Sequence, residues 1–184
     1  QHHLQAEGQW EQIHPFVRGG YWRNFKVKYS ETNVMYARMQ LVSRRLHEAL
    51  LAGASGDLID QARLELYRGQ CNCSYWPGAF GGVYLPHLRN AVYQHLIAAD
   101  NLLDQAENRG LEPWVTLEAG DWNFDGRPEA CLANNRLTTL VAPVEGGQIY
   151  ELDVKSICHN LGATLTRRPE AYHRKVLQGP SDAG

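Results

Sequence analysis

Apolar side chains recur at helical spacing in the first part of the chain. Within residues 32–52, spacings of four, three, four and three separate Met35, Met39, Val42, Leu46 and Ala49. This repeat places the five side chains on one stripe of a helix, which we expect to face the core. Gly53 follows directly and is typical of a helix end. The pattern therefore predicts a helix over residues 32–52.

Two further stretches have the same period. Asp57 is a suitable N-cap for a helix over residues 57–68, whose apolar side carries Leu58, Ala62 and Leu66. Pro86 suits the first turn of a third helix, and Gly110 lies beyond its end. The apolar stripe of this third helix consists of Leu88, Val92, Leu96, Ala99 and Leu103. Amphipathic helices joined by short connections predict an antiparallel helical bundle over residues 1–110.

The pattern changes to short β-type runs after residue 110. The runs are residues 114–117, 129–133, 137–143 and 148–154. Turn residues separate them, with Asn134 and Asn135 before the third run and Glu145-Gly146-Gly147 before the fourth. Residues 111–155 are therefore interpreted as antiparallel β-structure, and the fold class as α+β. A sheet of only three or four strands has unpaired edge strands. We therefore expect more strands in a longer parent chain.

Composition restricts the class of protein. The chain has 184 residues, of which 43% are hydrophobic and 21% are charged, and its net charge is −2. These values are typical of a soluble globular protein and give no electrostatic argument for nucleic acid or membrane partners, while the cysteines, which form no disulfide framework, favour a cytoplasmic location. No apolar run approaches the length of a membrane helix. The chain starts with Gln and ends in a polar tail, which we interpret as a piece of a longer polypeptide.

The stretch Gln70–Pro86 is the main candidate for binding. It reads QCNCSYWPGAFGGVYLP, and its glycines, Gly78, Gly81 and Gly82, favour a shaped loop between two helices. We expect this loop to present Tyr75 and Trp76. Rings beside the amides of Gln70 and Asn72 suit a carbohydrate site, because sugar C–H faces stack on rings and hydroxyls bond to amides. The alternative is that Trp76 fills the interior of the bundle.

Residues 9–29 mix aromatic and basic side chains. Tyr21, Trp22, Phe25 and Tyr29 are interleaved with Arg18, Arg23, Lys26 and Lys28. We expect the rings to pack in the core while the basic ends reach solvent. Contact with a sugar or a phosphate is the alternative.

A second candidate site is a calcium loop at residues 121–129. Asp121, Asn123, Asp125 and Glu129 occupy positions 1, 3, 5 and 9 of a calcium-loop pattern, with Gly126 at position 6. The carboxylate of position 12 is missing, because that residue is Leu132. The alternative is a metal-free Asp-Gly hairpin turn. The four cysteines, Cys71, Cys73, Cys131 and Cys158, have neither disulfide-framework nor zinc-site spacing, and we expect free thiols.

No catalytic motif with a fixed local spacing is present. The chain has no nucleophile elbow, phosphate loop, dinucleotide fingerprint or zinc-protease helix. Carboxylates are scattered, so no local pair predicts the acid and the nucleophile of a glycosidase.

Several longer motifs resemble glycoside hydrolase family 57, in particular its 4-α-glucanotransferase and α-amylase type. They are Arg18–Phe25 with Lys28-Tyr29, Gln70–Asn72 with Tyr75-Trp76, Phe80–Gly82 with Tyr84–His87, and Glu145–Asp153 with Tyr172-His173. The resemblance covers about residues 15 to 177. It implies the helical bundle of that family, over residues 1–110, followed by the first strands of its C-terminal β-sandwich over residues 111–184.

The resemblance also implies a function. The family's catalytic Glu and Asp lie in a barrel upstream of residue 1, so this chain carries no catalytic residue. It would be a segment of a retaining α-glucan-active enzyme, with Trp76, Tyr75, Asn72 and Gln70 as substrate-binding residues for an α-1,4-glucan or maltooligosaccharide. Cys73 and Pro77 replace an Asp and a His that the family typically has, which leaves open whether the enzyme is a hydrolase or a transferase.

Two other interpretations stay open. One is a non-catalytic carbohydrate-binding or interaction module, and the other is a family member whose barrel has lost its carboxylates. The expected partners are the glucan and the upstream catalytic barrel. A homodimer with a second copy of the chain also stays open. No cofactor is required, apart from the candidate calcium.

Overall fold

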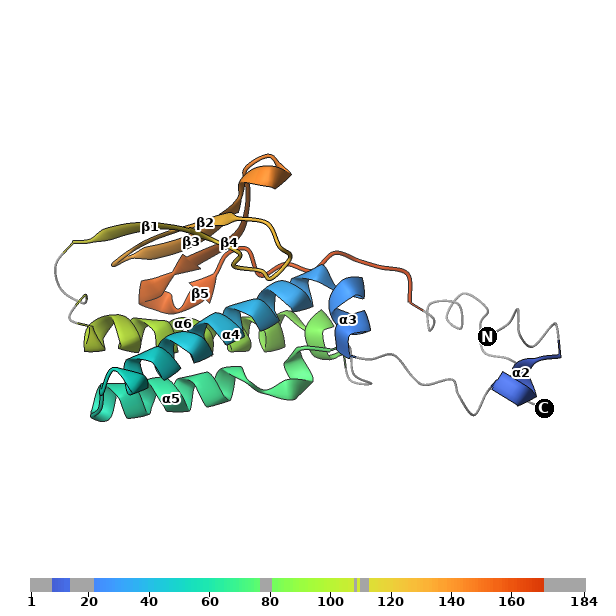
Figure 1. Cartoon of the computed structure of the whole chain (residues 1–184), viewed down its shortest axis with the longest axis horizontal. Coiled ribbons are helices and arrows are strands. Elements are labelled where there is room, and N and C mark those ends of the chain that lie inside the picture. Colours follow the sequence, from blue (N-terminus) through green and yellow to red (C-terminus); the bar gives the residue numbers. More distant parts are fainter. Residues whose placement is uncertain (1–7, 14–21, 77–80, 108, 110–112, 171–184) are drawn as a thin grey trace.

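The computed structural model describes residues 8–13, 22–76, 81–107, 109 and 113–170. Its helices are α2 (Trp10–Ile13), α3 (Trp22–Lys28), α4 (Ser30–Leu51), α5 (Asp57–Gly69) and α6 (Pro86–Ala106). Its strands are β1 (Val115–Gly120), β2 (Glu129–Asn134), β3 (Leu137–Ala142), β4 (Gln148–Val154) and β5 (His159–Asn160). The sheet lies on α4 and α6, and α5 lies on the side of these helices that faces away from the sheet (Figure 1). The α+β class is confirmed.

The bundle core is made from the apolar stripes that the sequence predicts. Met35, Met39, Val42 and Leu46 of α4 are buried together with Leu96 of α6. The helices approach closely at Gly69, the last residue of α5, where a Cβ atom would lie 2.7 Å from Cδ2 of Leu96. All three predicted helices are therefore confirmed, with bounds that differ by a few residues at most.

The five strands form one antiparallel sheet in the order β1-β2-β3-β4-β5. The four predicted β-type runs correspond to β1–β4, while the two-residue strand β5 was not predicted. One face of the sheet is apolar and exposed. Leu117 pairs with Leu132 on this face and is 69% exposed, while Val115 of the same strand is 76% exposed. The opposite face lies on the helices.

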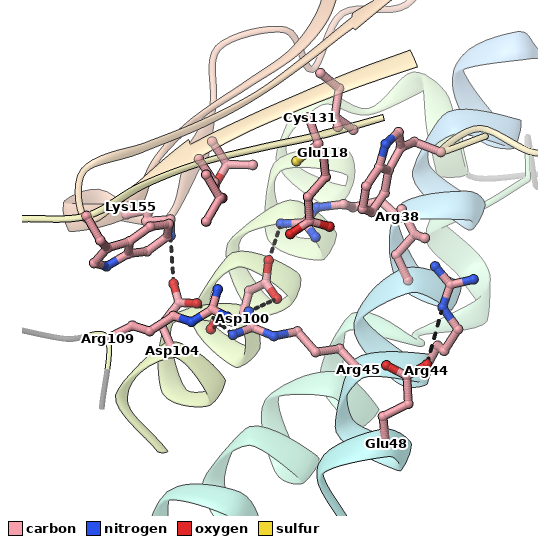
Figure 2. A pocket seen from close by; sticks show the side chains of 17 residues that line it. Arg38, Arg44, Arg45, Glu48, Asp100, Asp104, Arg109, Glu118, Cys131 and Lys155 are labelled. Atoms are coloured by element: carbon pink, nitrogen blue, oxygen red, sulfur yellow. Dashed lines mark hydrogen bonds and ion pairs between the residues drawn. The ribbon is translucent and has the colours of Figure 1, made fainter. Parts of the chain in front are cut away.

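Charged side chains join the sheet to the bundle, alongside buried apolar ones such as Leu140 of β3. Arg38 of α4 donates from Nε to Glu151 at 2.7 Å and from Nη2 to Asp100 at 2.7 Å and Asp153 at 3.3 Å. Arg45 bonds to Asp100 as well (Figure 2). Glu151 and Asp153 are alternate residues of β4, so both point from the sheet toward the helices, and both are 0% exposed.

The same network extends along α6. Asp104 accepts from Arg45 Nη2 at 2.7 Å and from Lys155 Nζ at 2.6 Å, which ties the end of β4 to the last turns of α6. Burial and the nearby charge of Asp153 raise the pKa of Glu151 well above its usual range, against the opposing effect of Arg38. Burial opposes the charge of Asp100 too, but Arg38 and Arg45 hold its pKa below its ordinary value.

After β5 the chain returns to the start of α4. We call residues 163–170 the return segment. Its backbone N–H at Thr166 donates to Glu31 at 2.8 Å, and Arg168 donates to the same carboxylate at 2.7 Å. Glu170 then accepts from Lys28 Nζ at 2.6 Å and from the hydroxyl of Tyr29 at 2.5 Å. These bonds fasten the return segment along α3 and the first turn of α4.

Helix α3 was not predicted as a helix, although Trp22, Phe25 and Tyr29 recur at the helical spacings of three and four. Within the described ranges, none of the helices is both long and apolar enough to span a bilayer.

Candidate functional site

The loop after α5 begins with a tight turn. Residues 72–74 form a single 3-10 turn, and the Tyr75 N–H donates to the Asn72 carbonyl at 3.0 Å. Gln70 and Asn72 are exposed residues. Gln70 makes one weak contact, from its Nε2 to the sulfur of Met39 at 3.6 Å. Among the described residues, both amides therefore keep most of their hydrogen-bonding capacity for solvent or a ligand.

The expectation that this loop presents Tyr75 is wrong. Tyr75 is only 5% exposed and belongs to the bundle core. Its hydroxyl donates to the Gly69 carbonyl at 2.6 Å, which caps the end of α5. Burial raises the pKa of Tyr75, because ionisation would leave a charge in the core. The Tyr75 ring therefore fills the interior of the bundle, which is the role that the alternative interpretation gave to Trp76.

Trp76, in contrast, is 39% exposed, as predicted. Its ring meets the ring of Phe25 edge-to-face, with centroids 6.5 Å apart. Phe25 in turn stacks on Trp22 and Tyr29 at centroid distances of 6.4 and 6.1 Å. A row of rings from α3 thus supports one side of the indole and leaves part of it open to solvent. Of the rings expected in the core, Tyr29 is buried, whereas Trp22 is 38% exposed and Tyr21 lies outside the described residues.

The other end of the loop fixes the backbone of Trp76. Val83 N–H donates to the Trp76 carbonyl at 3.2 Å. A Cβ atom on Gly82 would lie 1.9 Å from that carbonyl oxygen and 2.9 Å from the carbonyl oxygen of Cys73. Only glycine fits this close approach, as the loop interpretation requires. Pro77 and Gly78, to which the sequence also gave a role, lie outside the described residues.

An acidic residue from the return segment reaches the same end of the bundle. Glu170 accepts hydrogen bonds from the hydroxyls of Tyr29 and Tyr84, each at 2.5 Å, and from Lys28. Burial opposes its charge, but these three donors hold the pKa of Glu170 at about 2. Burial and the Glu170 bond raise the pKa of Tyr29 to about 12. Lys28, Tyr29 and Tyr84 were not predicted to share a carboxylate, since Glu170 is 141 residues from Tyr29.

The candidate calcium loop is a compact turn between β1 and β2. Asp121 accepts from the N–H groups of Asp125 and Gly126 at 3.0 and 2.9 Å, and Asn123 accepts from the Asp125 N–H at 2.9 Å. Glu129 accepts from the N–H groups of residues 122 and 123. In the part of the chain that the structure describes, no group of three His, Cys, Asp or Glu is arranged to hold a metal ion. The hairpin geometry is complete through hydrogen bonds alone.

The acidic side chains of this turn nevertheless repel one another. Burial, followed by the charges of Asp125 and Asp121, raises the pKa of Glu129. The four cysteines, all within the described ranges, are free thiols.

Models of two successive protein domains match this chain. The family described as "Alpha-amylase/4-alpha-glucanotransferase, middle domain" matches residues 20–103, and the corresponding C-terminal family matches residues 121–184. The chain belongs to the α-amylase/4-α-glucanotransferase family. The resemblance to glycoside hydrolase family 57 is thereby confirmed.

Individual relatives agree with this assignment. Alpha-amylase 1 of Dictyoglomus thermophilum is 38% identical over 98% of this chain and 25% of its own length. The 4-α-glucanotransferase of Thermococcus litoralis is 39% identical over 92% of this chain and 23% of its own length. The crystal structure of the Thermococcus litoralis enzyme matches with a TM-score of 0.71 at 37% identity, over 95% of this chain and 24% of that one. The chain therefore spans about a quarter of the length of these relatives.

Sequence reasoning missed the charged network between sheet and bundle. A signal was present, because Arg38 lies within the buried side of the predicted helix and Glu151 and Asp153 alternate in a predicted strand. Charged residues at core positions indicate mutual pairing. Which helix faced which strand could not be read from these local patterns.

Proposed function

We propose that the chain is a non-catalytic segment of a retaining enzyme that cuts α-1,4-glucans, and that it shapes the sugar cleft. The observation that carries the proposal is the match of residues 20–103 to the middle domain of the family, with Trp76 half exposed on a loop fixed between α5 and α6. The relatives are named as amylases and 4-α-glucanotransferases. In the complete polypeptide, an upstream barrel would supply the acid and the nucleophile.

The chemistry assigned to this chain is recognition. Trp76 offers a ring face to the C–H side of a glucose unit, and the exposed amides of Gln70 and Asn72 offer donors and acceptors for hydroxyls. The barrel would hold a glycosyl-enzyme intermediate and pass it to a sugar or to water. Tyr75 supports the loop from beneath instead of contacting the sugar.

The sheet supports the assignment of residues 111–184 to the start of a β-sandwich. The outer apolar face around Leu117 and Leu132 is the kind of surface that a second sheet covers. Strand β1 is also an edge strand in this chain. Further strands in the complete polypeptide would cover the face and pair the edge. The free thiols fit a cytoplasmic enzyme.

The experiment is the substitution Trp76→Ala in the complete polypeptide. We expect glucan binding or transfer to weaken by about 1–3 kcal/mol, the range for losing one stacking platform, with little change in melting temperature. Tyr67→Ala is the matched control, because Tyr67 is an aromatic residue on α5 that is 61% exposed. Unfolding of the Trp76 variant, with normal activity in its residual folded fraction, would contradict the proposal. An upstream barrel without carboxylates would instead indicate a binding module.

A further inference from the structure

The half-exposed ring of Trp76 is held at two points. Its indole meets the ring of Phe25 edge-to-face at a centroid distance of 6.5 Å, so α3 supports the ring. Its carbonyl accepts from the Val83 N–H at 3.2 Å, so the 3-10 turn at residues 82–84 fixes its backbone. Both supports must stay in place if the ring is to meet a sugar without first being ordered, because ordering a side chain on binding costs affinity.

Each of these two supports leads to a tyrosine. On one side, Phe25 stacks on Tyr29, with centroids 6.1 Å apart and 21° between the ring planes. On the other side, Tyr84 directly follows Val83 in the same 3-10 turn. The rings of Tyr29 and Tyr84 also meet edge-to-face, with centroids 6.0 Å apart. The two tyrosines are therefore the next residues outward from Trp76 along both supports.

A single carboxylate oxygen joins the two tyrosines. Oε1 of Glu170 accepts from both hydroxyls, while Oε2 accepts from Lys28 Nζ. The side chain of Glu170 is 10% exposed, so water competes little for these bonds. Burial, together with the bond to Glu170, raises the pKa of each tyrosine hydroxyl above its ordinary value, so both hydroxyls stay protonated and can donate. Hydrogen bonds to an ionised acceptor are stronger than those between neutral groups.

A second carboxylate fastens the return segment without touching the tyrosines. Glu31 accepts from the Thr166 N–H at 2.8 Å and from Arg168 at 2.7 Å. Within the described part of the chain, Glu31 makes no hydrogen bond to the hydroxyl of Tyr29 or Tyr84. Attachment of the return segment and contact with the tyrosine hydroxyls can therefore be removed separately.

We propose that Glu170 is a positioning residue for Trp76. From the return segment it holds Tyr29 and Tyr84 together, and through them it fixes both supports of the ring that stacks on the glucan. The sugar in this inference rests on the proposed function, while the arrangement of the supports rests on the contacts themselves. A residue in the range matched by the C-terminal family, 121–184, thereby completes a site built within the range matched by the middle domain, 20–103.

The first test follows the indole N–H resonance of Trp76 by NMR in the 184-residue chain. Glu170→Ala should shift and broaden this resonance, because the two tyrosines lose their common acceptor. Glu31→Ala is the matched control, since it also removes a carboxylate that fastens the return segment, and it should leave the indole resonance in place. An unchanged resonance in Glu170→Ala, or an equal shift in Glu31→Ala, would overturn the inference.

Two milder variants keep this test valid if Glu170→Ala does not fold. Tyr84→Phe removes one hydroxyl and keeps the ring, so it should move the indole resonance in the same direction by a smaller amount. Glu170→Gln should stay closer to the wild-type chain, because an amide oxygen can still accept from both hydroxyls. No movement of the resonance in Tyr84→Phe would overturn the inference.

The second test measures maltotetraose affinity in the complete polypeptide. Glu170→Ala should weaken binding about 3- to 10-fold, a part of what loss of the ring itself would cost. In a Trp76→Ala background the same change should have no further effect, because both residues act on one contact. An equal loss in both backgrounds would overturn the inference. If Trp76→Ala leaves the affinity unchanged while Glu170→Ala still moves the indole resonance, the proposed function fails and the positioning of the ring stands.

Discussion

Replacement of Arg38 by methionine tests whether charged contacts hold the sheet on the bundle. Arg38 makes three contacts with carboxylates, at 2.7, 2.7 and 3.3 Å. Hydrogen bonds to charged groups contribute about 1.5–3 kcal/mol each. Loss of Arg38 would leave Glu151 and Asp153, both 0% exposed, without this counter-charge. Breaking a buried pair from one side costs about 3–5 kcal/mol, and we expect a loss of unfolding free energy in that range at neutral pH.

The pH dependence gives this prediction a second, independent readout. Burial and Asp153 already raise the pKa of Glu151, and removing Arg38 would raise that pKa further. A carboxyl whose folded pKa lies above its unfolded pKa binds a proton on folding between these two values. Stability of the variant should therefore fall as pH rises from about 4.5 through the folded pKa. The penalty of Arg38→Met should be smaller at about pH 5 than at about pH 8.

The assay is urea denaturation of the wild-type chain and its variants at both pH values. Arg44→Met is the matched control, because Arg44 lies on the same helix, its side chain is 56% exposed, and its ion pair with Glu48 spans 4.0 Å. An exposed pair of this kind contributes less than about 1 kcal/mol. Combining Arg38→Met with Glu151→Gln and Asp153→Asn should restore part of the lost stability. If Arg38→Met costs no more than Arg44→Met at either pH, the network does not stabilise the interface and the argument fails.

Three shorter predictions follow. The purified 184-residue chain should show no turnover of maltooligosaccharides or starch, because the resemblance puts the catalytic carboxylates outside this chain. Glucose release above that of a mock preparation would contradict the prediction. Calcium should give neither calorimetric heat nor a rise in melting temperature, because the Asp121 and Asn123 oxygens already accept backbone N–H bonds; a heat and a thermal shift would support the calcium loop instead. Burial opposes the charge of Glu31, but Arg168 holds the pKa of Glu31 at about 2, below the ordinary 4.5. This ion pair should therefore stabilise the chain above about pH 4.5 and lose its effect as the pH falls toward 2. Arg168→Met should thus lower unfolding free energy at neutral pH and change it little near pH 2, as measured by denaturation at both values.

Periodic elements could be predicted from the sequence because their signal is local. The stripe from Met35 to Leu46 needs only one buried side of one helix, and it is buried in the structure. Helix α3 and the residue after it have a short stripe of Trp22, Phe25 and Tyr29, but the helix is only seven residues long and mixes these rings with basic residues, so its period is weak as a local signal. A two-residue strand such as β5 is too short to show any period.

The candidate site could be predicted only in part, for a geometric reason. Tyr75 and Trp76 are adjacent and similar in type, so composition predicts the same role for both. The 3-10 turn at residues 72–74 and the close approach of Gly82 turn Tyr75 into the core and leave Trp76 half exposed. The hydrogen bond from Asn33 of α4 to the Asn123 carbonyl joins residues 90 positions apart, so only the complete fold brings the β1–β2 turn onto α4.

The bond between Lys28 and Glu170 joins two positions 142 residues apart in the chain. The chain segments at Lys28 and Glu170 therefore lie close to one another at one end of this body. A body with adjacent entry and exit points can be transferred into another host chain with little distortion of either, as insertion domains are. The segment from Trp22 to Glu170, which keeps α3 and its ring contacts with Tyr36 and Trp76, is thus a natural unit for building chimaeras, in which the bundle and sheet of one family member replace those of another.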